Sequence, residues 1–192
     1  MDEFVFEPRL DAAAMKAFAH PLRLRMFSVL SNGGPATATG LAERLGESTG
    51  QTSYHLRQLE RHGLVEEDTS LGKGRERWWR ASSFSMRKRA GDATAPEVAV
   101  LRSAMVEDAA ATMQAWLSDD AAPQVWVDAS LEQSTTAILT PAELAVMNRE
   151  VQKVVDRHTS AGSGREAELR EADSTKLRRI RVYYYAFPLP QD

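Results

Sequence analysis

The segment 48-STGQTSYHLRQLERHGLV-65 constrains the fold most, because it contains both ends of a helix and its buried face. Ser48 followed by Gln51 fits a capping box, so a helix is predicted over residues 49–61, closing at His62-Gly63. At about 100° per residue, Thr52, Leu56 and Leu59 fall in one narrow sector, which is the predicted core face. The opposite side is polar and comprises Gly50, Ser53, Tyr54, Arg57, Gln58 and Arg61.

Further helices are predicted before this segment, over residues 11–19, 21–33 and 37–46. His20-Pro21 separates the first two, because the residue before proline avoids helical geometry and proline suits a first helical turn. After the helix the period changes. The runs LVEEDTS and RERWWRA, separated by 71-LGKG-74, predict a β-hairpin over residues 64–81. Helices followed by such a hairpin is the order of elements in a winged helix-turn-helix domain.

The second half predicts a separate, smaller α+β unit. Residues 85–96 have the composition of a linker, and residues 97–118 are predicted to be one long helix. Alternating residues around Val125, Val127 and Leu131 predict a half-buried strand, and 178-RRIRVYYYAFP-188 predicts another. Thr140-Pro141 with Glu143 marks a helix start between them. The predicted class is α+β, with domains at 1–84 and 97–192 joined by the linker 85–96.

Charge and composition favour an anionic partner for the first half. The chain of 192 residues has net charge -3, but residues 1–90 carry +3 and the remainder -6. Cysteine is absent, which excludes disulfides and thiolate metal sites, and the four histidines have no metal-ligand spacing, so we expect no metal and no cofactor. No apolar run approaches the roughly 20 residues of a membrane helix, and the acidic start is unlike a signal peptide, which favours the cytoplasm.

The polar side of helix 49–61 suits double-stranded DNA. Arginine can fork onto guanine and glutamine onto adenine, while hydroxyls donate to phosphate oxygens. Small residues at the front allow the helix N-terminus to approach a phosphate. Basic residues of the hairpin alternate and therefore share one strand face, as phosphate contacts require. The predicted DNA-binding residues are Thr49, Gln51, Ser53, Tyr54, Arg57 and Gln58 on the helix, with Lys73, Arg75 and Arg77 on the hairpin.

The motifs 17-AFAHPLRLRMFSVL-30, 37-TATGLAERLG-46, 53-SYHLRQLERHGLV-65 and 72-GKGRERWWR-80 resemble the ArsR-type winged helix-turn-helix regulators of bacteria. The resemblance covers about residues 11–81. It implies a dimeric, sequence-specific DNA-binding repressor or activator, with helix 49–61 in the major groove and hairpin 64–81 as the wing; of the two roles we expect the repressor. Metal-sensing relatives use cysteines that this chain lacks, so the resemblance does not carry metal sensing over.

The sequence allows two interpretations of each of several further features. The stripe Val98, Leu101, Met105, Thr112 and Trp116 on helix 97–118 either pairs two copies into a homodimer or packs on its own domain. The aromatic strand 182-VYYYAF-187 either lines a pocket for a small-molecule effector or is covered on both faces. A winged domain can also bind protein without DNA. An enzyme is not expected, since no phosphate-binding loop, nucleophile elbow or metal-ligand cluster is present.

Overall fold

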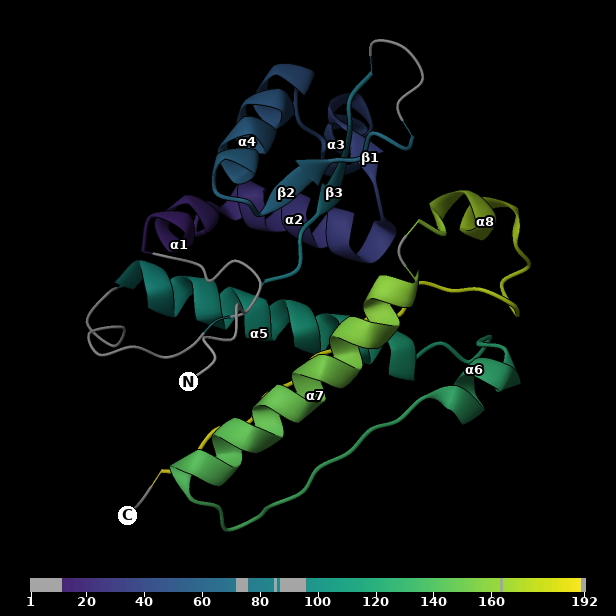
Figure 1. Cartoon of the computed structure of the whole chain (residues 1–192). Coiled ribbons are helices and arrows are strands. Elements are labelled where there is room, and N and C mark those ends of the chain that lie inside the picture. Colours follow the sequence, from purple (N-terminus) through teal and green to yellow (C-terminus); the bar gives the residue numbers. More distant parts are fainter. Residues whose placement is uncertain (1–11, 72–75, 85, 87–95, 163, 191–192) are drawn as a thin grey trace. The chain divides into compact units, whose positions relative to one another are not determined.

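The computed structural model describes residues 12–71, 76–84, 86, 96–162 and 164–190 (Figure 1). The N-terminal part of the chain begins with four helices. They are α1 (Ala12–Phe18), α2 (Pro21–Gly33), α3 (Ala38–Leu45) and α4 (Thr49–Arg61). The chain divides into two units, residues 1–116 and 117–192. The four helices confirm the predicted ones to within a residue or two at each end; Asp11, where the first is predicted to start, lies outside the described residues.

Local capping explains where these helices begin and end. His20 is the N-cap of α2, and its Nδ1 accepts a hydrogen bond from the Leu22 amide at 3.2 Å. Thr37 caps α3 in the same way through the Gly40 amide at 3.1 Å. α3 ends at Gly46, whose φ of 69° lies in the left-handed region that favours glycine. The turn that follows therefore delivers the chain directly to the cap of α4.

A three-stranded antiparallel sheet completes the winged helix. β2 (Val65–Glu67) and β3 (Trp78–Ala81) pair with Val65 opposite Ala81 and Glu67 opposite Trp79. This register confirms the predicted hairpin, whose tip at 72–75 lies outside the described residues. On its other side β3 pairs with β1 (Ala36–Thr37), which is too short for any sequence period to predict. The sheet order β1-β3-β2 makes β3 the central strand.

The core of the first unit lies between α2, the sheet, α4 and the start of α5 (Pro96–Leu117). In Figure 1, α4 stands beside the strands and α2 passes beneath them. Val98 and Leu101 of α5 are buried in this core, and α5 also meets α2 through a hydrogen bond from the Ser28 hydroxyl to Asp108. Val98 and Leu101 of the apolar stripe therefore pack on the N-terminal core. This differs from both predicted alternatives, because the sequence places this helix in the domain 97–192 and predicts packing there or pairing with a second copy.

The second unit contains helices and no strand among its described residues. α6 (Gln124–Ala129), α7 (Pro141–Gly162) and α8 (Glu166–Glu171) follow in order. The capping box at Thr140 is confirmed: Glu143 accepts from the Thr140 amide at 2.8 Å and hydroxyl at 2.7 Å. The chain as a whole is α+β, as predicted, with its strands in the first unit.

The strand predicted around Val125, Val127 and Leu131 is wrong. Residues 124–129 form α6, in which Gln124 donates to Asp128 at 2.8 Å, one helical turn away. Trp126 fixes this helix by donating its indole N–H to the Ser174 carbonyl at 2.7 Å. Leu131, beyond the helix, is 82% exposed. Alternation over a few residues misled the prediction, because a strand also needs a neighbour to pair with and the described part of this unit offers none.

The predicted C-terminal strand 178–188 also forms no sheet. Side chains hold this segment instead: Arg179 donates three hydrogen bonds to the Glu166 carboxylate, the shortest at 2.7 Å, and the Tyr184 hydroxyl donates to Asn148 on α7 at 2.9 Å. Tyr185 and Phe187 of the aromatic run are exposed, so this run is not covered on both faces. None of the described helices combines the length and apolar character that a membrane span needs.

Candidate nucleic-acid interface

Helix α4 is rigidly attached to the domain by its inner face. Leu56 and Leu59 are fully buried, and the buried Thr52 hydroxyl donates to the Ala38 carbonyl at the start of α3, at 2.8 Å. The N-terminus is closed by the predicted capping box: the Ser48 hydroxyl accepts from the Gln51 amide, and the Gln51 side chain accepts from the Ser48 amide, both at 3.3 Å. The orientation of α3 against α4, which defines a helix-turn-helix, is therefore set by one buried hydrogen bond and apolar packing.

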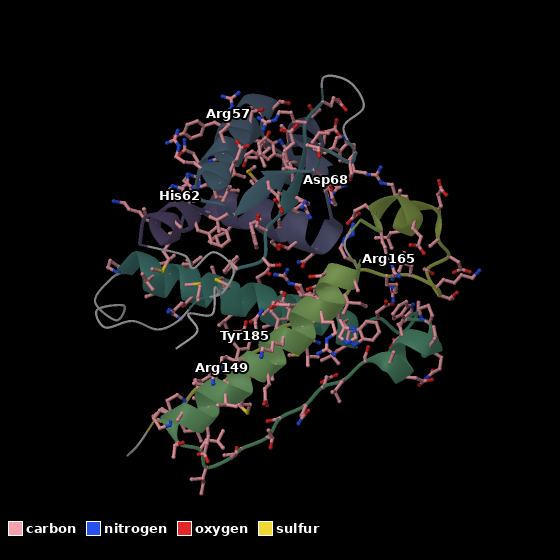
Figure 2. All side chains as sticks on the ribbon, in the orientation of Figure 1. Arg57, His62, Asp68, Arg149, Arg165 and Tyr185 are labelled. Atoms are coloured by element: carbon pink, nitrogen blue, oxygen red, sulfur yellow. The ribbon has the colours of Figure 1, made fainter. Side chains whose placement is uncertain are left out.

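Four of the six contact residues predicted on α4 are exposed to solvent. Tyr54 is 55% exposed, and Figure 2 shows Arg57 on this helix in the N-terminal unit. Thr49, Gln51 and Arg57 are exposed, while Ser53 and Gln58 are half-buried at the edge of the face. Gln51 combines two roles in this arrangement, because its carbonyl oxygen is engaged in the cap while its amide N–H groups remain donors.

An open depression of about 250 Å³ lies between α4, the start of α3 and the hairpin. Ser53 and Arg57 line it from α4, and Arg77 and Trp79 line it from the hairpin side. The depression shows that the exposed face of α4 is continuous with the hairpin surface. A duplex lying along α4 would therefore meet the hairpin as well.

The two tryptophans of the hairpin and Arg77 contact the rest of the first unit. Trp79 is buried and Trp78 half-buried, so one indole packs fully on the domain. Arg77 donates from Nε to Glu67 at 2.7 Å and from Nη2 to Glu60 at 3.0 Å. These contacts raise the pKa of Arg77, with the hydrogen bond to Glu67 contributing most. Lys73 and Arg75 lie outside the described residues, so the shared basic face of the hairpin stays a prediction.

Basic side chains of the His-Pro-Leu-Arg and Ser-Tyr-His-Leu motifs form a cluster in the folded domain. The His20 and His55 rings lie 4.5 Å apart between centroids, and Arg23 Nη1 lies 3.5 Å from His55 Nδ1. Arg23 also donates to the Ala17 carbonyl of α1. His55 is only 8% exposed, so it lies on the buried side of α4. The cluster joins α1, α2 and α4, and the sequence alone did not indicate that these side chains meet.

The burial of His55 predicts a pH-dependent stability. Burial lowers the pKa of His55 below its ordinary value of 6.5, assisted by His20 and Arg23 and opposed by Glu47. The unfolded chain then takes up a proton near pH 6.5 that the folded chain resists. We expect the free energy of unfolding to fall as the pH drops through about 6.5, and the fall to end below the folded pKa.

Urea unfolding between pH 8 and pH 5, on the protein and on His55→Gln, measures this effect. His55→Gln should show a shallower fall, because the titrating group is gone. His158→Gln, which removes an exposed histidine of α7, is the matched control and should keep the full fall. Parallel curves for His55→Gln and the unchanged protein would contradict the assignment.

Metal ligands do not gather in the described part of the chain, where no three His, Asp or Glu side chains are placed to hold an ion. The interface therefore consists of hydroxyl, amide, phenol and guanidinium groups on one helix face, with an arginine-bearing hairpin beside it. Such groups recognise anionic and hydrogen-bonding surfaces without a bound ion.

Comparison with known proteins identifies a helix-turn-helix domain in the first unit. Residues 18–68 match a family of helix-turn-helix domains, which confirms the predicted helix-turn-helix. No curated protein matches the chain. Among solved structures, HlyU from Vibrio cholerae is 28% identical over 37% of this chain and 70% of its own, with a TM-score of 0.33. A protein described as an ArsR family transcriptional regulator is 22% identical over 55% and 89%, with a TM-score of 0.32. A mutant of ZitR from Lactococcus lactis is 13% identical over 77% and 83%, with a TM-score of 0.31.

Proposed function

We propose that this chain, whose residues 18–68 form a helix-turn-helix domain, is an ArsR-type transcriptional repressor that binds double-stranded DNA as a homodimer. The observation that carries the proposal is the outer face of α4. Its side chains are exposed and polar, while the inner face is fixed by Thr52 and by fully buried leucines. A rigid helix with an exposed face of this chemistry fits the major groove, which admits one α-helix.

Each contact residue has a distinct proposed role. Arg57, near the middle of the exposed face, forks onto a guanine edge, and Gln58 pairs with adenine. Gln51, whose carbonyl oxygen is held in the cap, donates from its side-chain amide to an acceptor on the duplex. Ser53 and Tyr54 donate to phosphate oxygens and set the register of the helix on the duplex. Thr49 lies in the first turn, where free amides favour a phosphate. The hairpin cations Lys73 and Arg75 add contacts to the neighbouring backbone.

The homodimer is proposed because two reading helices are needed to bind two half-sites. The predicted α5 stripe is not available for this contact, since Val98 and Leu101 are buried in the core. Another row on α5 stays exposed, with Val106 57% exposed and Met113 on the same side two turns later. We assign the contact with a second copy to this row, whose spacing of seven residues suits packing between two helices.

Selection from a random double-stranded DNA library tests the proposal with the full chain. We expect one enriched sequence made of two inverted half-sites about 10 base pairs apart, as a two-fold dimer requires. Arg57→Glu should lower affinity for that sequence by about 10- to 100-fold, because a bidentate base contact is replaced by repulsion from phosphate. Arg157→Glu makes the same charge change on an exposed residue of α7 and should leave affinity unchanged.

The outcomes separate the alternatives. Enrichment of a single half-site would contradict the proposed homodimer but support sequence-specific DNA binding. If no sequence is enriched and Arg57→Glu binds DNA as the unchanged protein does, the domain is a protein-interaction module instead. The effector that we propose for the second unit is a small apolar molecule contacting the aromatic residues at 183–187. Its binding should change the affinity of the unchanged protein for its selected site.

A further inference from the structure

Arg77 contacts three elements of the N-terminal unit at once. It follows the hairpin tip and immediately precedes β3. Its guanidinium donates to Glu67 on β2 at 2.7 Å and to Glu60 in the last turn of α4 at 3.0 Å. Its Cζ lies 4.3 Å from the ring centroid of Trp79, the buried indole of the central strand. A single planar group thus connects the recognition helix, both strands of the hairpin and the core.

The geometry depends on arginine specifically. A guanidinium has several N–H donors in one rigid plane, so it can bind two carboxylates along its edges while its face stacks on an aromatic ring. The ammonium of lysine is a point charge and cannot do both. The Glu60 and Glu67 carboxylates converge on the same guanidinium, so without it two like charges would lie close together beside the proposed DNA surface.

We propose that Arg77 is a positioning residue that fixes the hairpin against the recognition helix for DNA binding, rather than a ligand of a DNA phosphate. Its hydrogen-bonding edges already face carboxylates. Its contribution to binding is to hold the hairpin at one angle to α4 and to offset two carboxylates that would repel the duplex. This inference rests on the proposed DNA binding and changes the role that the sequence alone assigned to Arg77.

Two substitutions of Arg77 separate the two roles. A phosphate ligand is replaced well by lysine, which binds phosphate as a point charge, whereas the bridge to two carboxylates and an indole is not. We therefore expect Arg77→Lys and Arg77→Gln to lower affinity for the selected DNA to a similar degree, about three- to tenfold, in line with the loss of two exposed ion pairs. The slope of log affinity against log salt should stay the same for Arg77→Lys.

Arg80→Gln is the matched control. Arg80 lies on β3, three residues after Arg77, and pairs with Glu66 at 3.1 Å on the other face of the hairpin, with an equally exposed side chain. Its replacement removes one positive charge and one surface ion pair without touching α4. We expect this variant to bind DNA as the unchanged protein does, which shows that the loss at Arg77 is not a general effect of charge.

A second measurement needs no DNA and separates failure of this inference from failure of the proposed function. In the free protein, amide hydrogen exchange of β2 and β3 should be faster in both Arg77 variants and unchanged in Arg80→Gln, because Arg77 bonds the hairpin to Glu60 of α4, whereas Arg80 pairs with Glu66 within the hairpin. Wild-type affinity in Arg77→Lys, with lower affinity and a slope flatter by about one unit in Arg77→Gln, would make Arg77 a phosphate ligand and overturn the proposal. Unchanged exchange in all three variants would overturn it as well.

Discussion

Replacing Phe18 by alanine is expected to lower the free energy of unfolding of the N-terminal unit by about 3–5 kcal/mol, the usual cost of deleting a buried aromatic ring. Phe18 is almost fully buried at the end of α1. Its ring meets Phe27 of α2 at 4.9 Å and Phe84, just beyond β3, at 5.6 Å between centroids, both edge to face. Alanine leaves a cavity at the place where three parts of the chain converge, so these neighbours cannot all move in to fill it.

Urea unfolding followed by circular dichroism measures this loss on the full chain. Phe187→Ala is the matched control, since it deletes the same side chain at a position that is 67% exposed in the second unit. That variant should stay within about 0.5 kcal/mol of the unchanged protein. Equal losses from the two substitutions would contradict the assignment of Phe18 to the core.

The parts of this fold that could be predicted from sequence are those with local causes. The start of α2 follows from His20 and Pro21, and the start of α4 follows from Ser48 and Gln51, which are three residues apart. The switch to the hairpin follows Gly63, whose φ of 66° allows the chain to turn. Each of these signals acts between residues within one helical turn, so the sequence contains all of it.

The candidate site was predictable in position but not in pairing. The burial of Thr52, Leu56 and Leu59 fixes which side of α4 faces outward, and helical spacing alone yields that result. The partner of Arg77 could not be predicted in this way. Glu60 lies 17 positions earlier in the chain, and only the folded hairpin brings it to the guanidinium. Alternation along a strand identifies which residues share a face and contains no information about what that face meets.

The second unit shows the same limit at larger scale. A period of two around Val125 and Val127 is compatible with a strand, but strand formation depends on a neighbouring strand that local sequence does not specify. Here the Trp126 indole is held by the carbonyl of Ser174, 48 residues away, and residues 124–129 are helical. Both wrong strand predictions, around Val125 and at 178–188, concern segments whose contacts are distant in the sequence. The capping box at Thr140 depends on residues three positions apart and was predicted correctly.

The placement of α5 leads to the second large prediction. Leu101 is fully buried in the N-terminal core, although it follows the segment predicted as a linker. Leu101→Ala should therefore cost about 2–5 kcal/mol of the free energy of unfolding, because burial is lost and a cavity remains. Val100→Ala, at the preceding position of the same helix, deletes exposed methyl groups outside the proposed dimer contact and should change it by less than about 0.5 kcal/mol.

Variants of Leu101 and Val106 separate the two roles proposed for α5. If α5 packs on the core through Leu101 and pairs with a second copy through Val106, then Leu101→Ala lowers stability at every protein concentration. Val106→Asp instead should raise the concentration at which the protein becomes dimeric in sedimentation experiments and leave the folded monomer intact, because a carboxylate is unfavourable in an apolar contact between helices. A Leu101→Ala protein as stable as the unchanged chain would mean that α5 does not belong to the N-terminal core.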